Sequence, residues 1–147
     1  MQISSRFTIA VHVLICIETF KEKNKITSDF LASSVNANSV IIRKLLQQLK
    51  KAGIVAVIRG SGGADICKSL DAITLFDVYE AVECVEDGKL FHFHENPNPL
   101  CPVGRNIHSI LDARLEQIQM ALEKEMKSVT IQDIVNDSQK MIAEEKV

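Results

Sequence analysis

An apolar stripe in the last third of the chain most strongly limits how this sequence can fold. Apolar residues recur there at steps of three or four positions: Ile107, Leu111, Leu115, Ile118, Leu122, Met126 and Val129. This spacing is typical of a coiled-coil seam and predicts one long helix from about Pro102 to Ser128. A helix of that length has little to pack against in a chain of 147 residues. A symmetric partner helix is the simplest cover for the stripe, so we expect a homodimer.

The charge is unevenly divided along the chain. Residues 1–70 carry ten Lys and Arg against four Asp and Glu, whereas residues 71–147 carry seven against fifteen. A basic half joined to an acidic half indicates that one part meets an anionic partner. The alternative is that these charges lie on solvated surfaces that meet no partner. Aromatic residues make up 5% of the chain and Trp is absent, which argues against base stacking on aromatic platforms.

The basic half begins with two predicted helices of unequal length. The first follows the apolar pattern from Ile3 to Phe20. The second is short, roughly Ser28 to Ser34, and Thr27 or Ser28 can cap it. Residues 36–38, with the sequence Asn-Ala-Asn, then predict a tight turn.

A third helix follows the turn and has the clearest apolar periodicity. Asn38 or Ser39 caps its start, and Gly53 lies just past its end, where a left-handed cap is expected. Its inner face is predicted to carry Ile42, Leu45, Leu46, Leu49 and Ala52.

The remaining elements are a hairpin, a linker and further helices. Two β-branched and apolar segments, Ile54 to Arg59 and Ala64 to Lys68, flank a glycine-rich turn and predict the hairpin. Thr74 can cap a helix that runs to about Val85. Asp87 to Gly104 contains all three prolines and is interpreted as a linker. Thr130 can cap a last helix.

The order helix, short helix, turn, helix and hairpin is that of a winged helix-turn-helix, a DNA-binding fold. The third helix combines an apolar inner face with a cationic outer face, which suits the major groove. We expect its N-terminal residues to reach base edges: Asn38, Ser39, Val40 and Arg43. Lys44 and Gln47 suit a base or a phosphate, and Lys50 and Lys51 suit phosphate.

The hairpin supplies the predicted wing. Arg59 precedes a flexible tip, so its side chain and the backbone of Ser61 and Gly62 can approach a phosphate or the minor groove. The alternative for Arg59 is an ordinary exposed charge at a strand end. Its position directly after a recognition-like helix favours DNA contact.

Several segments together resemble the Rrf2 family of bacterial transcription regulators. They are QISSRFTIAVHVL at the start, VNANSVIIRKLLQQLKKAGIV, the wing IRGSGG, DAITLFDVYEAVE, and CPVG before the long helix. The resemblance covers nearly the whole chain. It implies a homodimer crossed through the long C-terminal helix, which binds double-stranded DNA at a palindromic operator, usually as a repressor.

The sequence also departs from the family. Members commonly follow the wing glycines with Tyr and an apolar residue, whereas Asp65 here would repel phosphate. Some members hold an iron–sulfur cluster through three cysteines in the loop before the dimer helix. Only Cys101 lies there, and Cys84 is far upstream. We therefore expect no cluster and no metal site. The alternative is an iron–sulfur or metal-sensing regulator of the same fold that uses His92, His94 and Cys101.

Cys101 is the candidate sensor. It precedes Pro102 at a helix N-terminus, where the partial positive charge stabilises a thiolate, and Arg105, His92 and His94 are expected to add to this. Our hypothesis is that an oxidant or electrophile modifies Cys101 and weakens DNA binding. The alternative is a linker cysteine that senses nothing. We expect the cysteines at positions 16 and 67 to be buried.

These observations predict a mainly α protein with a small β hairpin. We divide it into a winged helix-turn-helix domain (1–86), a linker or sensor loop (87–104), and a dimerisation helix with a C-terminal helix (105–147). The longest apolar stretch, Ile9 to Ile17, is too short to span a bilayer, and the start does not resemble a signal peptide, so we expect a cytoplasmic protein. A Cys–His hydrolase that uses Cys101 is the alternative of another class. The chain has no nucleophile elbow, phosphate loop or paired carboxylates, so we expect no enzyme.

Overall fold

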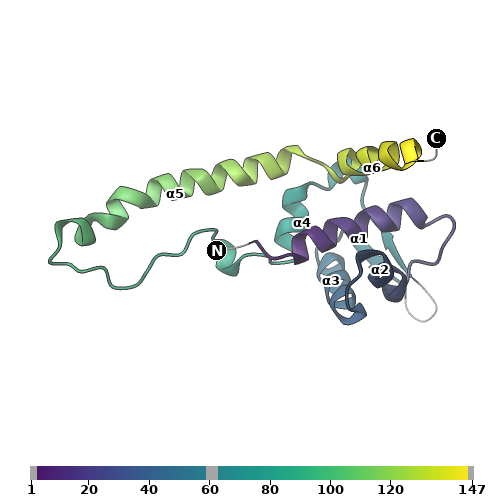
Figure 1. The fold of residues 1–147 in the computed structure, drawn as a ribbon, viewed down its shortest axis with the longest axis horizontal. Coiled ribbons are helices and arrows are strands. Elements are labelled where there is room, and N and C mark those ends of the chain that lie inside the picture. Colours follow the sequence, from purple (N-terminus) through teal and green to yellow (C-terminus); the bar gives the residue numbers. More distant parts are fainter. Residues whose placement is uncertain (1–2, 59–62, 146–147) are drawn as a thin grey trace.

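A helical body and one projecting helix make up the molecule (Figure 1). The computed structural model describes residues 3–58 and 63–145. The longer elements, in chain order, are α1 (Arg6–Phe20), α2 (Ser28–Val35), α3 (Ser39–Lys51), β1 (Val55–Val57), β2 (Ala64–Ile66), α4 (Leu75–Ala81), α5 (Pro102–Ser128) and α6 (Ile131–Glu145). Short 3-10 turns lie at Leu70–Ala72 and Glu86–Gly88. The predicted fold class is confirmed, and the long helix has the predicted bounds.

The helix-turn-helix is defined by local caps. Thr27 begins α2, because its Oγ1 accepts a hydrogen bond from the Phe30 N–H at 3.1 Å. Asn36 ends α2 in the left-handed region at φ 59°, which Asn tolerates better than most residues. Asn38 then begins α3, because its Oδ1 accepts from the Val40 N–H at 2.8 Å. The predicted turn and caps are thus confirmed.

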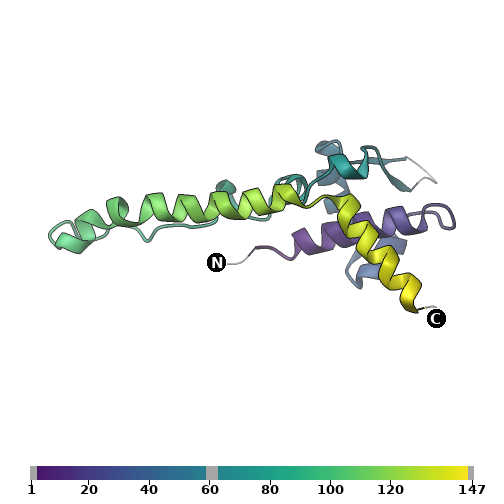
Figure 2. The ribbon, with the colours of Figure 1, turned by 90° about the horizontal axis from the view of Figure 1, so that it is seen from above.

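α1 and α3 supply the most buried residues of the main core, and α6 adds to it from the end of the chain. Buried aliphatic side chains come from each of these helices, namely Val13, Leu14, Ile17, Ile42, Leu45, Leu49, Ile131 and Val135. α6 crosses over α1 (Figure 2), so segments from both ends of the chain share one core. The predicted inner face of α3 is wrong at one position. Ala52 is exposed because α3 ends at Lys51 and Gly53 turns the chain away at φ 78°.

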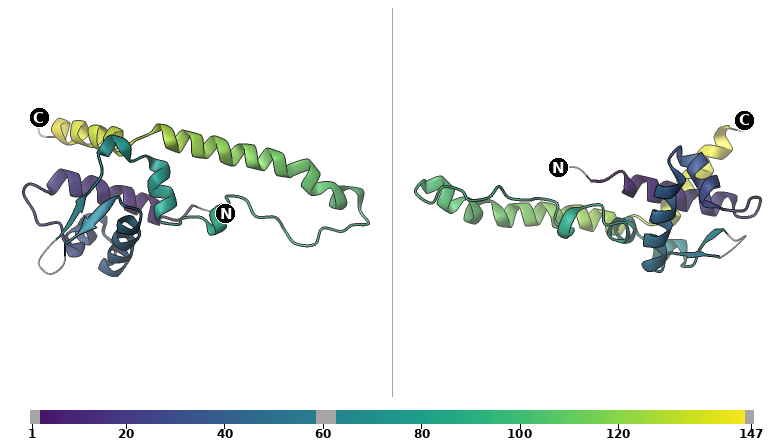
Figure 3. Two further views of the ribbon diagram at one scale, coloured as in Figure 1. Left: turned by 180° about the vertical axis from the view of Figure 1, so that it is seen from behind. Right: turned by 90° about the horizontal axis from the view of Figure 1, so that it is seen from below.

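The hairpin packs beside α3 (Figure 3). Its strands are antiparallel, with Val55 opposite Ile66, and both are shorter than predicted. The Ala64 N–H donates to the carbonyl of Ile26 at 2.8 Å. A Cβ on Gly63 would collide with that same carbonyl, so the close approach requires glycine. The segment before α2 therefore fixes where the wing begins.

The start of α1 differs from the prediction. The helix begins at Arg6 rather than Ile3, because the chain before it makes contacts outside the helix. The Ser4 N–H donates to the carbonyl of Cys84 at 3.2 Å, and the Arg6 guanidinium donates to the carbonyl of Glu83 at 2.9 Å. These bonds attach the start of the chain to the segment after α4.

α4 begins as predicted but ends earlier. Thr74 forms a capping box with Asp77, in which each residue's side chain accepts from the other's backbone N–H. The helix ends at Ala81 and not near Val85, because Glu83 takes the left-handed conformation at φ 48°.

α5 projects from the body, and the linker runs back along it (Figure 2). Gln119 joins the two segments. Its Oε1 accepts from the Leu90 N–H at 3.0 Å, and its Nε2 donates to the Gly88 carbonyl at 2.8 Å. Leu90 is buried beside this clamp. One side chain of α5 therefore holds the first residues of the linker in place.

The junction between α5 and α6 is tied to the residues around Thr74. Thr74 and Thr130 form an antiparallel bridge, the Leu75 N–H donates to the Val129 carbonyl at 2.9 Å, and the Ile131 N–H donates to the carbonyl of residue 73 at 2.8 Å. The base of α5 is thus joined to the body. The division at residues 86 and 104 stays a prediction. None of the described helices is both long and apolar enough to cross a membrane.

Candidate nucleic-acid interface

The outer face of α3 is exposed and cationic. Its charged and polar residues Arg43, Lys44, Gln47, Lys50 and Lys51 are all exposed. Within residues 3–58 and 63–145, the ion pairs are Lys21 with Glu18 and His108 with Asp112, so none of these α3 cations is paired there. Cations without an internal partner are available to neutralise phosphate.

The first turn of α3 presents a mixed surface. Asn38 and Val40 are exposed and Ser39 is half-buried. The Asn38 Oδ1 is occupied by its cap to the Val40 N–H, so this residue positions the turn. Base contact by these three residues and by Arg43 stays a prediction.

A groove of about 300 Å³ separates α3 from the hairpin. Arg43 and Gln47 line it from α3, Ile58 and Gly63 line it from the hairpin, and Thr27 lines it from the start of α2. The structure thus brings two predicted DNA contacts next to the base of the wing. Arg59, Ser61 and Gly62 lie outside the described residues. Asp65 is exposed, and its Oδ1 accepts from the N–H of the next residue at 2.9 Å.

The stripe on α5 is only partly covered within the single chain. None of the 27 residues of α5 is buried. Ile118 in the stripe is 52% exposed, and Ile110 and Met120 beside it are 51% and 61% exposed. An apolar stripe that stays exposed on a helix marks a surface for contact with a partner.

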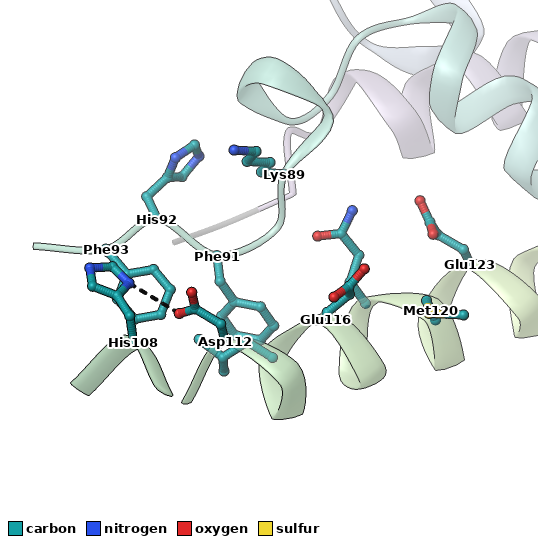
Figure 4. A pocket seen from close by; sticks show the side chains of 11 residues that line it. Lys89, Phe91, His92, Phe93, His108, Asp112, Glu116, Met120 and Glu123 are labelled. Carbon is teal, nitrogen blue, oxygen red and sulfur yellow. Dashed lines mark hydrogen bonds and ion pairs between the residues drawn. The ribbon is translucent and has the colours of Figure 1, made fainter. Parts of the chain in front are cut away.

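A second groove, of about 620 Å³, lies between the linker and α5 (Figure 4). Phe91 and Phe93 reach it from the linker, and His108 and Asp112 from α5. The His108 ring lies 4.5 Å from that of Phe93, and its Nδ1 lies 3.1 Å from Asp112 Oδ1. His108 therefore helps hold the linker beside α5.

Cys101 occupies the cap position of α5 and is half-buried. The backbone N–H groups of Gly104 and Val103 lower the pKa of its thiol. The contribution expected from Arg105, His92 and His94 stays a prediction. The helix N-terminus itself stabilises the thiolate.

The CPVG motif has a packing reason as well. The Cys101 N–H donates to the Asn98 carbonyl at 3.2 Å, and a Cβ on Gly104 would collide with this same carbonyl. Asn98 and Gly104 thus fix the turn that carries the thiol. No helical or strand period marks this contact or the Gln119 clamp, and neither was predicted.

The other cysteines lie in separate places. Cys16 is buried, as predicted, with its Sγ 3.0 Å from a serine hydroxyl of α2, and Cys84 is buried after α4. Cys67 was predicted to be buried, but it is exposed because β2 ends at Ile66. Among the described residues, no three His, Cys, Asp or Glu side chains are grouped as metal ligands.

A sequence model of the Rrf2 family, described as iron-dependent transcriptional regulators, matches residues 3–137. The chain belongs to the Rrf2 family. This Rrf2 protein is 41% identical over 134 residues to YwnA of Bacillus subtilis (strain 168), named as an HTH-type transcriptional regulator; the match covers 91% of this chain and 97% of YwnA.

Solved structures share the Rrf2 fold of this chain. A crystal structure described as that of a DNA-binding protein is 35% identical, covers 88% of this chain and 98% of its own, and superposes with a TM-score of 0.68. CymR of B. subtilis, described as the global cysteine regulator, is 21% identical, with coverages of 92% and 97% and a TM-score of 0.65.

Within residues 3–58 and 63–145, no grouped set of ligands matches the iron in the family description. Cys101 is half-buried at the start of α5, whereas Cys16 and Cys84 are buried in the body and Cys67 lies by the wing. Cluster iron in proteins of this kind is held mainly by thiolates. Three thiolates are not brought together within this chain, so its cysteines do not fit a cluster site.

Proposed function

We propose that this protein is a homodimeric, cytoplasmic repressor that binds a palindromic operator through α3 and the wing. The observation that carries the proposal is the exposed cationic face of α3 beside the hairpin groove. A helix with this surface fits the major groove, and a neighbouring wing can meet the adjacent backbone.

The incompletely covered stripe of α5, with Ile118 exposed, supports the dimer. A second copy of α5 provides a matching apolar surface, and a two-fold axis places the same residues on both sides. Because each copy then carries one α3, the dimer presents two reading helices related by the same axis. Such a protein recognises two inverted half-sites about one helical turn apart.

The DNA-binding proposal is tested by a gel shift with the duplex upstream of the protein's own coding sequence, in the presence of competitor DNA. We expect Arg43→Ala to weaken binding by about 10-fold to 100-fold, because it removes a bidentate or phosphate contact. Lys140→Ala is the matched control, since it removes an exposed cation from α6. Equal affinity of the two variants would contradict the proposed interface. A reporter gene under the same promoter then distinguishes repression from activation.

We further propose that oxidation of Cys101 releases the operator. The thiolate sulfur attacks one oxygen of hydrogen peroxide, the O–O bond breaks, and the products are a sulfenic acid and hydroxide. The added oxygen removes the negative charge that Gly104 and Val103 stabilise and enlarges a group held in a tight turn. The linker and the start of α5 would then shift relative to each other.

Two serine variants test this redox response. Cys101→Ser is expected to stay bound to DNA after peroxide treatment. Cys67→Ser is the matched control, because Cys67 is the other cysteine that is not buried, and it should release DNA like the wild type. Release of Cys101→Ser by peroxide would exclude this residue as the sensor.

We propose that the protein works without a resident cluster and without a catalytic step. The separation of its cysteines supports the first point, and no hydrogen bond within the described residues joins Cys101 to a histidine. The absorption spectrum of anaerobically purified protein tests the cluster. Strong visible absorption would favour the alternative, an iron–sulfur regulator of the same fold.

A further inference from the structure

Val40 is the most exposed apolar side chain of α3 and shares a face with polar residues, whereas Ile41 beside it is 43% exposed. Val40 is 60% exposed, and Arg43, Lys44 and Gln47 follow it at steps of three, four and seven residues. Residues at these steps share one face of a helix. A single exposed valine is ordinary on a protein surface. Val40, however, lies in the first turn of the helix proposed to enter the major groove, where its side chain would face the base edges.

The local structure holds Val40 in one orientation. The Asn38 cap accepts from the Val40 N–H at 2.8 Å, so the backbone of the first turn is fixed. A valine side chain in a helix strongly prefers one rotamer because it branches at Cβ. Two methyl groups therefore project from α3 with little conformational freedom left to lose on binding.

The chemistry of the major groove offers one apolar partner. Each base edge there presents hydrogen-bond donors or acceptors, and thymine alone adds a C5 methyl group. A valine can neither donate nor accept, and beside any other base edge it would cover polar atoms without replacing their hydrogen bonds. Contact with a thymine methyl removes apolar surface from water on both sides.

We infer that Val40 contacts a thymine methyl and makes the protein select thymine at one position of each half-site. This inference rests on the proposed function, since it assigns a base preference to the same interface. Arg43 on the same face supplies the polar contact, and Val40 supplies the apolar one.

The test is a double-mutant cycle between protein and DNA. The probe is the duplex that the wild-type protein enriches most strongly from a randomised pool. It is prepared in two forms, one synthesised with thymidine triphosphate and one with deoxyuridine triphosphate in its place. The second form lacks every thymine methyl. Burial of one methyl corresponds to about a fourfold change in affinity, and two half-sites give about 15-fold. We expect the wild type to bind the uracil duplex about 15-fold more weakly.

The variants locate this effect. Val40→Ala should bind both duplexes with nearly equal affinity. Ile58→Ala is the matched control, because Ile58 is a 62% exposed aliphatic residue on the hairpin, where a wing would meet the backbone or minor groove and no thymine methyl. It should retain the 15-fold preference. Uracil can also change the shape of the DNA, but that effect is the same for the wild type and both variants, so it cancels when their preferences are compared.

The outcomes separate the two levels of the proposal. Wild-type protein that enriches no duplex overturns the proposed function and this inference with it. Specific binding in which Val40→Ala retains the full thymine preference, or in which Ile58→Ala loses it equally, overturns the inference alone. Because Val40 is exposed, the alanine variant keeps its core, and an unchanged circular dichroism spectrum verifies this.

Discussion

Replacing Ile118 by alanine should weaken the dimer without unfolding the chain. Ile118 lies in the middle of the α5 stripe and is 52% exposed in the single chain. None of the residues of α5 is buried there, so the substitution opens no cavity in the core of one protomer. Alanine also has the highest helix propensity, so α5 itself is retained.

The size of the effect follows from the surface that remains to be covered. Full burial of an isoleucine side chain is worth about 1.5–3 kcal/mol, and about half of this one is still exposed. Truncation to alanine therefore removes about 1 kcal/mol from each copy. A two-fold dimer contains the substitution twice, so the dimer loses about 2 kcal/mol, which corresponds to about a 30-fold increase in its dissociation constant.

Sedimentation equilibrium over a series of protein concentrations measures this dissociation constant directly. Met141→Ala is the matched control, because Met141 is a 66% exposed apolar residue on α6 and lies outside the stripe. Its dissociation constant should equal that of the wild type. The reasoning is refuted if the wild type stays monomeric at every concentration, or if Ile118→Ala dimerises as tightly as Met141→Ala.

Three further predictions concern the linker, the thiols and the last helix. Gln119→Ala should lower the free energy of unfolding by about 1–2 kcal/mol, because both hydrogen bonds to the linker are lost. Hydrogen exchange at the Leu90 amide should become faster in this variant, and unchanged protection of that amide would contradict the clamp. Iodoacetamide should alkylate Cys101 at a lower pH than an ordinary cysteine, because its pKa is lowered and more thiolate is present at a given pH, whereas burial raises the pKa of Cys84. Mass spectrometry of the two peptides across pH checks that order, and the reverse order would refute it. Thr130→Ala should cost about 1 kcal/mol in urea unfolding, because the α6 capping box is lost, and an unchanged midpoint would show that the cap is not needed.

The elements with a strong local signal could be predicted from the sequence. α5 has its predicted bounds because Pro102 suits the first helical position and the stripe keeps its period to the end. α3 was predicted because Asn38 caps it and four buried residues recur at helical spacing. The cationic face of the candidate interface follows directly from that assignment, since residues opposite a buried face must be exposed.

Contacts between distant segments could not be predicted in this way. The Gln119 clamp joins residues about thirty positions apart through a side-chain amide, and such a bond leaves no periodicity. Cys67 was misplaced because the strand signal extended to Lys68, whereas pairing stops at Ile66. The sites at Gly63 and Gly104 depend on carbonyl groups of other segments, which sequence spacing does not reveal.

The packing of α6 on α1 has a consequence for the order in which the protein is made. Ile17 near the start of the chain and Ile131 near its end belong to the same core. The core around α1 therefore cannot be completed until translation has passed α5. At ordinary synthesis rates this interval lasts roughly 6–25 s, during which the apolar face of α1 has only part of its cover. α5 is therefore synthesised before the core around α1 is complete, and the helix-turn-helix has its full packing only once α6 has been made.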